Sequence, residues 1–143
     1  YHIHANMKVF ADGKPVDLSE SKYQSTDGKE LNEFMHFHDG KGDMFHVHKK
    51  GMLLKDLFGS VGMTFTGKPF ALYVNGTLNA SYDSYEPQEL DRILIISGST
   101  PEGDIKTKLD SVSDDACIYS EKCPERGTPP TEECVGGLGT DCK

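Results

Sequence analysis

The run RILIIS, residues 92–97, predicts the centre of a β-sheet. Four apolar residues follow one another in it, so both faces of a strand built from them would be apolar. Such strands are typical of positions that are buried on two sides. We therefore expect a central strand here, with its second face partly covered by the C-terminal tail or by a partner chain.

Two segments nearer the N-terminus also predict strands. Residues 70–74, FALYV, form a strand-like run that ends in an Asn-Gly turn signal. Residues 1–10 alternate between apolar and polar side chains, which is the period of a half-buried strand. The Asp12-Gly13 pair after them predicts a hairpin, with residues 15–18 as the return strand.

Two segments have helical spacing. Residues 53–61 place apolar side chains on one stripe, and Gly62 lies where the residue after a helix C-terminus belongs. A second, shorter helix is expected around residues 105–112, with a start signal at residues 99–102, STPE. Beyond it the chain predicts an irregular tail.

The order of hairpin, helix and later strands resembles the β-grasp (ubiquitin-like) fold over residues 1–98. Residues 72–95 resemble the end of that fold, where the last strand follows an acidic turn. The resemblance implies an α+β protein with a β-grasp-like mixed sheet packed on one helix. An extra pair of strands before the helix, expected at residues 34–38 and 44–48, departs from that pattern. Residues 99–143 would then add the short helix and a Cys-rich tail.

The cysteines indicate an oxidising compartment. An even number in a Pro/Gly-rich tail predicts two disulfides, with three possible connectivities. Reduced thiols or a small zinc knot are the alternatives, although the spacing lacks the close C-x2-C pairs of zinc ribbons. The four cysteines all lie in the C-terminal tail: Cys117, Cys123, Cys134 and Cys142.

Two further features favour an extracellular or cell-surface location. Sequons for N-glycosylation begin at Asn75 and Asn79. The chain starts at Tyr1 already in a strand-like pattern, so we expect that a targeting or anchoring segment has been removed.

The charge balance bears on the partners. The 143 residues contain 15 basic and 23 acidic side chains, for a net charge of −8. Such a surface repels nucleic acid and anionic membranes. No apolar run approaches the roughly 18 residues that a membrane span needs.

All six histidines occur in three H-x-H pairs with an apolar residue in the middle. Residues i and i+2 of a strand share a face, about 6.6 Å apart, so both imidazoles of a pair can converge on one ion. A polar or pH-responsive face and stacking at a protein interface are the alternatives to metal binding. The pairs are His2 and His4, His36 and His38, and His46 and His48.

The second and third pairs would face each other in a hairpin. If the turn centres on Gly42, His38 lies opposite His46 and His36 lies opposite His48. Opposed side chains on an antiparallel ladder have Cβ atoms about 4.5–5.5 Å apart. These four histidines are therefore the first predicted metal ligands.

The first pair would complete that site or form another. The pair is His2 and His4, and the Tyr1 amine could join His2 if Tyr1 is the mature terminus. Imidazole suits copper and zinc, and we expect copper first and zinc second.

Other residues near the histidines have simpler interpretations. Met7, Met35 and Met44 are expected to pack in the core. Asp39 and Asp43 could bind the metal or orient an imidazole, but ordinary turn chemistry is the preferred interpretation.

The pattern leaves catalysis undecided and favours a protein that is not an enzyme. In the cupins a Glu follows the H-x-H motif closely, whereas here no Glu comes between His48 and Glu86. The α-carbonic anhydrases also hold zinc with an H-x-H strand and a third His, but this chain is too short for that fold. A three-His zinc hydrolase or lyase stays a minor alternative.

The strand H-x-H pattern with a C-terminal Cys segment also resembles His-rich extracytoplasmic domains of archaea and little-studied bacteria. We therefore expect an extracellular or cell-surface metal-binding protein. The alternative is a structural subunit of a self-assembling surface filament, in which metal bridges exposed histidines of neighbouring copies.

Overall fold

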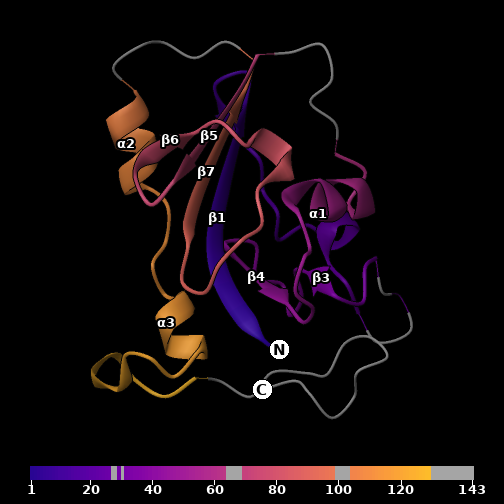
Figure 1. The fold of residues 1–143 in the computed structure, drawn as a ribbon, viewed down its shortest axis with the longest axis vertical. Coiled ribbons are helices and arrows are strands. Elements are labelled where there is room, and N and C mark those ends of the chain that lie inside the picture. Colours follow the sequence, from indigo (N-terminus) through magenta and orange to yellow (C-terminus); the bar gives the residue numbers. More distant parts are fainter. Residues whose placement is uncertain (27–28, 30, 64–68, 99–103, 130–143) are drawn as a thin grey trace.

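The computed structural model describes residues 1–26, 29, 31–63, 69–98 and 104–129, which form a mixed seven-stranded sheet with short helices on both sides (Figure 1). The strand order is β3-β4-β1-β7-β5-β6, and β2 pairs with β1 beside this path. The expected α+β class is therefore confirmed.

The elements within the described ranges are as follows. The strands are β1 (Ile3–Ala11), β2 (Lys14–Pro15), β3 (Met35–His36), β4 (Met44–Val47), β5 (Phe70–Val74), β6 (Thr77–Asn79) and β7 (Arg92–Ser97). The helices are α1 (Leu54–Ser60), α2 (Ile105–Asp110) and α3 (Ala116–Tyr119), with 3-10 turns η1 (Ser21–Tyr23), η2 (Tyr82–Ser84) and η3 (Pro124–Arg126).

The predicted central strand is β7. It pairs in parallel with β1, with Met7 opposite Ile93, and antiparallel with β5 on its other side. Residues 93–96 are at most 3% exposed, so both faces of the strand are buried. Apolar side chains on both faces favour this position because either face would otherwise meet water.

Helix α1 covers one face of the sheet (Figure 1). Its buried residues Leu54, Leu57 and Phe58 pack in the main core against alternate residues of the strands. Gly62 follows the C-cap with φ +73°, the left-handed conformation that glycine adopts readily, as the sequence predicts.

The second face of β7 is covered by a later part of the same chain. Leu94 and Ile96 form a smaller core with Val112, against which Ile105 and Leu109 of α2 pack. The expected cover by the irregular tail is therefore wrong: among the described residues, the cover is the segment 105–112, which the sequence predicts as the short helix. The predicted helix start at residues 99–102 lies outside the described residues.

Several local predictions are confirmed and two are too long. Asp12 and Asn75 each begin a two-residue turn with positive φ, as the sequence signals require. The return strand expected at residues 15–18 is only β2, and the strand expected at 34–38 is only β3. Phe37 leaves the β3–β4 ladder and forms an isolated bridge with Gln24 instead.

The tail contains one of the two expected disulfides. Cys117 and Cys123 are joined, with their Cα atoms 5.5 Å apart. Cys134 and Cys142 lie outside the described residues. Among the described helices, none combines the length and apolar character that crossing a bilayer requires.

Any residue larger than glycine at position 42 is expected to destabilise the fold. A Cβ there would overlap the backbone N of Ser19 and lie 2.6 Å from the carbonyl carbon of Leu18. Gly42→Ala should therefore lower the free energy of unfolding by about 1–3 kcal/mol, as other overpacking substitutions do. Gly59→Ala is the matched control, because nothing lies within 4 Å of its added Cβ in α1. Urea unfolding should show the control unchanged or stabilised by about 0.5–1 kcal/mol; equal effects at both positions would contradict the packing argument.

Candidate metal centre

The three H-x-H pairs lie side by side at one end of the sheet. They come from the start of β1, from β3 and the residues after it, and from the end of β4. Because β4 lies between β1 and β3, His46 has a histidine opposite it on each side: His4 in β1 and His36 in β3. The same register places His2 opposite His48.

The predicted register about Gly42 is wrong. The pairing is His36 with His46, and the backbone N–H of His48 donates to the carbonyl of Phe34, so the hairpin is shifted by two residues. After His38 the chain makes its own turn in place of the ladder: Asp39 has φ 61° and the carbonyl of His38 accepts from the N–H of Lys41. A shift of two residues leaves every side chain on its original face, so the histidines still meet.

The middle residue of each pair points to the main core, as expected. Ile3, Phe37 and Val47 all belong to the core cluster that α1 covers. Met7 and Met35 also belong to it, and Met44 is buried, which agrees with packing roles.

The histidine face is not a solvent-exposed surface. His4, His36, His38 and His46 are each 2–4% exposed, and His2 and His48 are half-buried. The histidines exposed at a strand edge, which the filament hypothesis assumes, are therefore not found at these four positions. Part of the cover comes from α3, since the Tyr119 ring lies 6.0 Å from the His4 ring.

The six imidazoles form two rows of three, which we call the histidine array. In the first row the ring centroids of His4 and His46 are 4.6 Å apart, and those of His46 and His38 are 4.1 Å apart. In the second row His48 lies between the other two, with centroid distances of 4.5 Å to His2 and 5.3 Å to His36. The array thus brings together all six predicted ligands.

Three members of the array lie close enough together to be able to hold one metal ion. Ligand nitrogens of His2, His4 and His46 all lie within 4.8 Å of one another. His2 Nε2 is 3.2 Å from His46 Nδ1. Two nitrogens bound to one tetrahedral zinc at about 2.0–2.1 Å lie about 3.3 Å apart, so this pair matches the edge of such a site.

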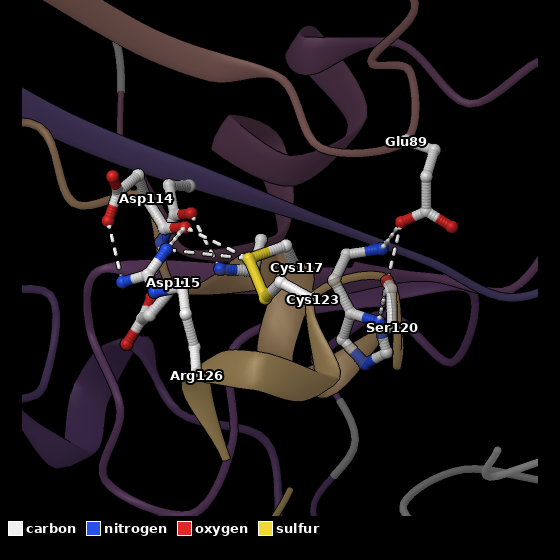
Figure 2. Close-up of a disulfide and its surroundings, with 10 residues drawn as sticks. Glu89, Asp114, Asp115, Cys117, Ser120, Cys123 and Arg126 are labelled. Carbon is white, nitrogen blue, oxygen red and sulfur yellow. Dashed lines mark hydrogen bonds and ion pairs between the residues drawn. A yellow bond between two sulfur atoms is a disulfide. The ribbon is translucent and has the colours of Figure 1, made fainter. Parts of the chain in front are cut away.

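The proton on His4 can be assigned from its partners. Ser120 Oγ lies 2.7 Å from His4 Nδ1 and 2.6 Å from Glu89 Oε1 (Figure 2). A carboxylate oxygen only accepts, so the hydroxyl proton goes to Glu89 and Ser120 accepts from the Nδ1–H of His4. The lone pair of His4 is therefore on Nε2.

Two other histidines carry the proton on the same nitrogen. His36 Nδ1 donates to the carbonyl of Asn32 over 2.8 Å, and His38 Nδ1 donates to the Asp39 carboxylate over 2.7 Å. Metal-bound histidines almost always donate their other ring N–H to such partners, which fixes the ring and the tautomer. Asp39 thus has the orienting contact that the sequence leaves open, whereas Asp43 accepts from Ser113 and Lys41.

Sequence reasoning misses Ser120 and Glu89. Ser120 is 116 residues from His4 in the chain and has no motif of its own. The only related signal is the pair of cysteines on either side of it, which predicts a closed loop but not its position on β1.

Burial favours the neutral form of three members of the array, His36, His46 and His48. Desolvation lowers the pKa of His36 to about 4, against the opposing hydrogen bond to Asn32. It lowers the pKa of His48 to about 3 and that of His46 well below its usual value, with neighbouring imidazolium charges adding to the effect. Neutral imidazole is the form that binds metals.

These pKa values predict acid sensitivity of the metal-free protein. Below the unfolded pKa of 6.5 the unfolded chain binds protons that folded His36 does not bind until about pH 4. The free energy of unfolding should therefore have its maximum contribution from these histidines above pH 6.5. Between pH 6.5 and 4 it should fall by about 1.4 kcal/mol per pH unit for each such histidine. Urea titrations at pH 7.5, 6.5, 5.5 and 4.5 test this; a constant value from pH 7.5 to 5 would contradict it.

Comparison of the chain with protein families, curated proteins and solved structures finds no match. The function must therefore be argued from the site alone.

Proposed function

We propose that this protein binds a transition-metal ion through His2, His4 and His46, with copper as the first choice and zinc as the second. The observation that carries the proposal is the convergence of their three ligand nitrogens within 4.8 Å. The proton position on His4 supports it, because Nε2 is left as a lone-pair donor.

The donor set favours this class of metal. Three imidazoles supply only nitrogen, which suits copper, zinc and nickel rather than magnesium or calcium. At equal geometry divalent copper binds such sites more tightly than zinc does. Three protein ligands leave a position for water, so the three-His zinc hydrolase or lyase stays an alternative.

We also propose an extracellular or cell-surface location and a β-grasp-like fold. The Cys117–Cys123 disulfide supports an extracellular or cell-surface location, since such bonds persist in oxidising compartments. The parallel β1–β7 pair at the sheet centre, with α1 on one face, supports the β-grasp resemblance. The filament alternative would need contacts other than the four buried histidines.

Metal titration of the metal-free chain tests the proposal. Calorimetry and elemental analysis with Cu²⁺ and with Zn²⁺ should give at least one ion per chain at micromolar metal. At free metal 100 times above the dissociation constant, binding should add about 2.7 kcal/mol to the free energy of unfolding. The thermal midpoint should rise by about 10 °C.

A pair of variants on β1 provides the control. His4→Gln should lose this binding, whereas Lys8→Gln, on the same face of β1 but outside the histidine array, should keep it. Fewer than one ion per native chain, or equal binding by both variants, would refute the proposed site.

A further inference from the structure

The other half of the histidine array contains three histidines that the proposed site does not use. His36 lies at its corner, with ring centroids 5.3 Å from His38 and 5.3 Å from His48. They come from β3, from the turn after it and from the residue that follows β4. Each is on the same sheet face as the first three.

Two nitrogens in this half are buried without a hydrogen-bond partner. They are His36 Nε2 and His48 Nδ1. The His36 side chain is 2% exposed, and its Nδ1 carries the proton that goes to Asn32. The buried Nε2 therefore carries a lone pair. A buried acceptor of this kind lowers the stability of the fold unless a donor or a cation binds it.

Each half of the array has one imidazole linked to a carboxylate. In the first half it is His4, through Ser120 to Glu89; in the second it is His38, directly to Asp39. A carboxylate behind the imidazole raises its basicity as a ligand and offsets part of the charge of a bound cation. One imidazole–carboxylate pair would suffice to support one ion. The second imidazole–carboxylate pair is therefore not explained by a single metal site.

We infer that His36, His38 and His48 bind a second ion of the same class, copper or zinc, beside the first. This rests on the proposed function, namely that the array takes metal at all. His46 lies between the two groups, 4.1 Å from the His38 ring and 4.6 Å from the His4 ring. Because the two cations repel each other, the second ion binds more weakly than the first.

The alternative occupant is a water molecule. A water could donate to both His36 Nε2 and His48 Nδ1, and it would satisfy them without a cation. The two occupants differ in stoichiometry, so counting ions separates them.

Four chains decide the matter: native, His4→Gln, His36→Gln and the double variant. Calorimetry and elemental analysis with Zn²⁺ and Cu²⁺ should give two ions, one, one and none per chain. With Cu²⁺, the paramagnetic resonance signal of the native chain should grow up to one equivalent. It should then fall as the second ion couples to the first, and neither single variant should show this loss.

The other outcomes are equally definite. The native chain could bind one ion that His36→Gln keeps and His4→Gln loses. That result would overturn the second site and leave the first site in place. One ion that only His36→Gln loses overturns both assignments. No ion on the native chain overturns the proposed function. If His36→Gln fails to fold by circular dichroism, His48→Gln at the half-buried position replaces it with the same expected count.

Discussion

Replacing His46 by Gln is expected to lower the affinity of the His2–His4–His46 site for Cu²⁺ or Zn²⁺ by about two orders of magnitude. Structural zinc sites with four ligands bind with about 10–16 kcal/mol, or about 3 kcal/mol per ligand. Losing one ligand therefore costs on the order of a hundredfold. His46 is the most demanding position to test, because its ring contacts those of five other histidines.

Competition with a chelator of known affinity measures the change. His46 is 2% exposed, so the variant also needs a measure of folding: circular dichroism and urea unfolding of the metal-free chain. Lys8→Gln serves again as the control on the same sheet face. If a folded His46→Gln chain bound the metal with native affinity, the ion would be bound by residues other than His46, and the proposed site would be refuted.

Removing the Ser120 hydroxyl is expected to weaken the same site by about 10–100-fold without touching a ligand. Loss of an outer hydrogen-bond partner has effects of this size in other metal proteins. In Ser120→Ala the His4 Nδ1–H loses its acceptor, so the ring is free to turn and its Nε2 leaves the convergent position. Glu89→Gln should act in the same direction, since Glu89 accepts from both Ser120 and the backbone N–H of His4.

Two further variants separate this positioning role from general destabilisation. Ser113→Ala removes a similar hydrogen bond, 2.8 Å to Asp43, away from the histidines, and should leave affinity unchanged. Ser120→Thr keeps the hydroxyl and should retain most of the binding. Equal losses in Ser113→Ala and Ser120→Ala would refute the positioning role.

The disulfide loop gives an independent measurement of the same contact. Ser120 lies between Cys117 and Cys123, which are six positions apart, and Arg126 binds Asp114 beside this loop (Figure 2). Reduction of this bond should loosen the loop and lower metal affinity in the native chain. In Ser120→Ala, where the hydroxyl is already absent, reduction of the disulfide should lower the metal affinity only slightly further.

The site shows how far strand periodicity can carry a prediction. The three H-x-H pairs are in phase with an apolar middle residue, and that phase fixes which face all six imidazoles occupy. It survives even the register error at Gly42, because a shift of two residues preserves the face. The strand period does not tell whether that face is exposed to solvent. The burial of His4, His36, His38 and His46 was therefore not predictable from it.

By itself the sequence determined the local elements: the central strand at residues 92–97, helix α1, the two-residue turns at Asp12 and Asn75, and the shared face of the histidines. These follow from interactions between residues close in the chain. Only the tertiary structure decided that β1 lies between β4 and β7, that His46 is the centre of the array, and that Ser120 and Glu89 support His4. Those contacts join residues far apart in the chain, and they depend on how whole elements pack, which no local spacing records.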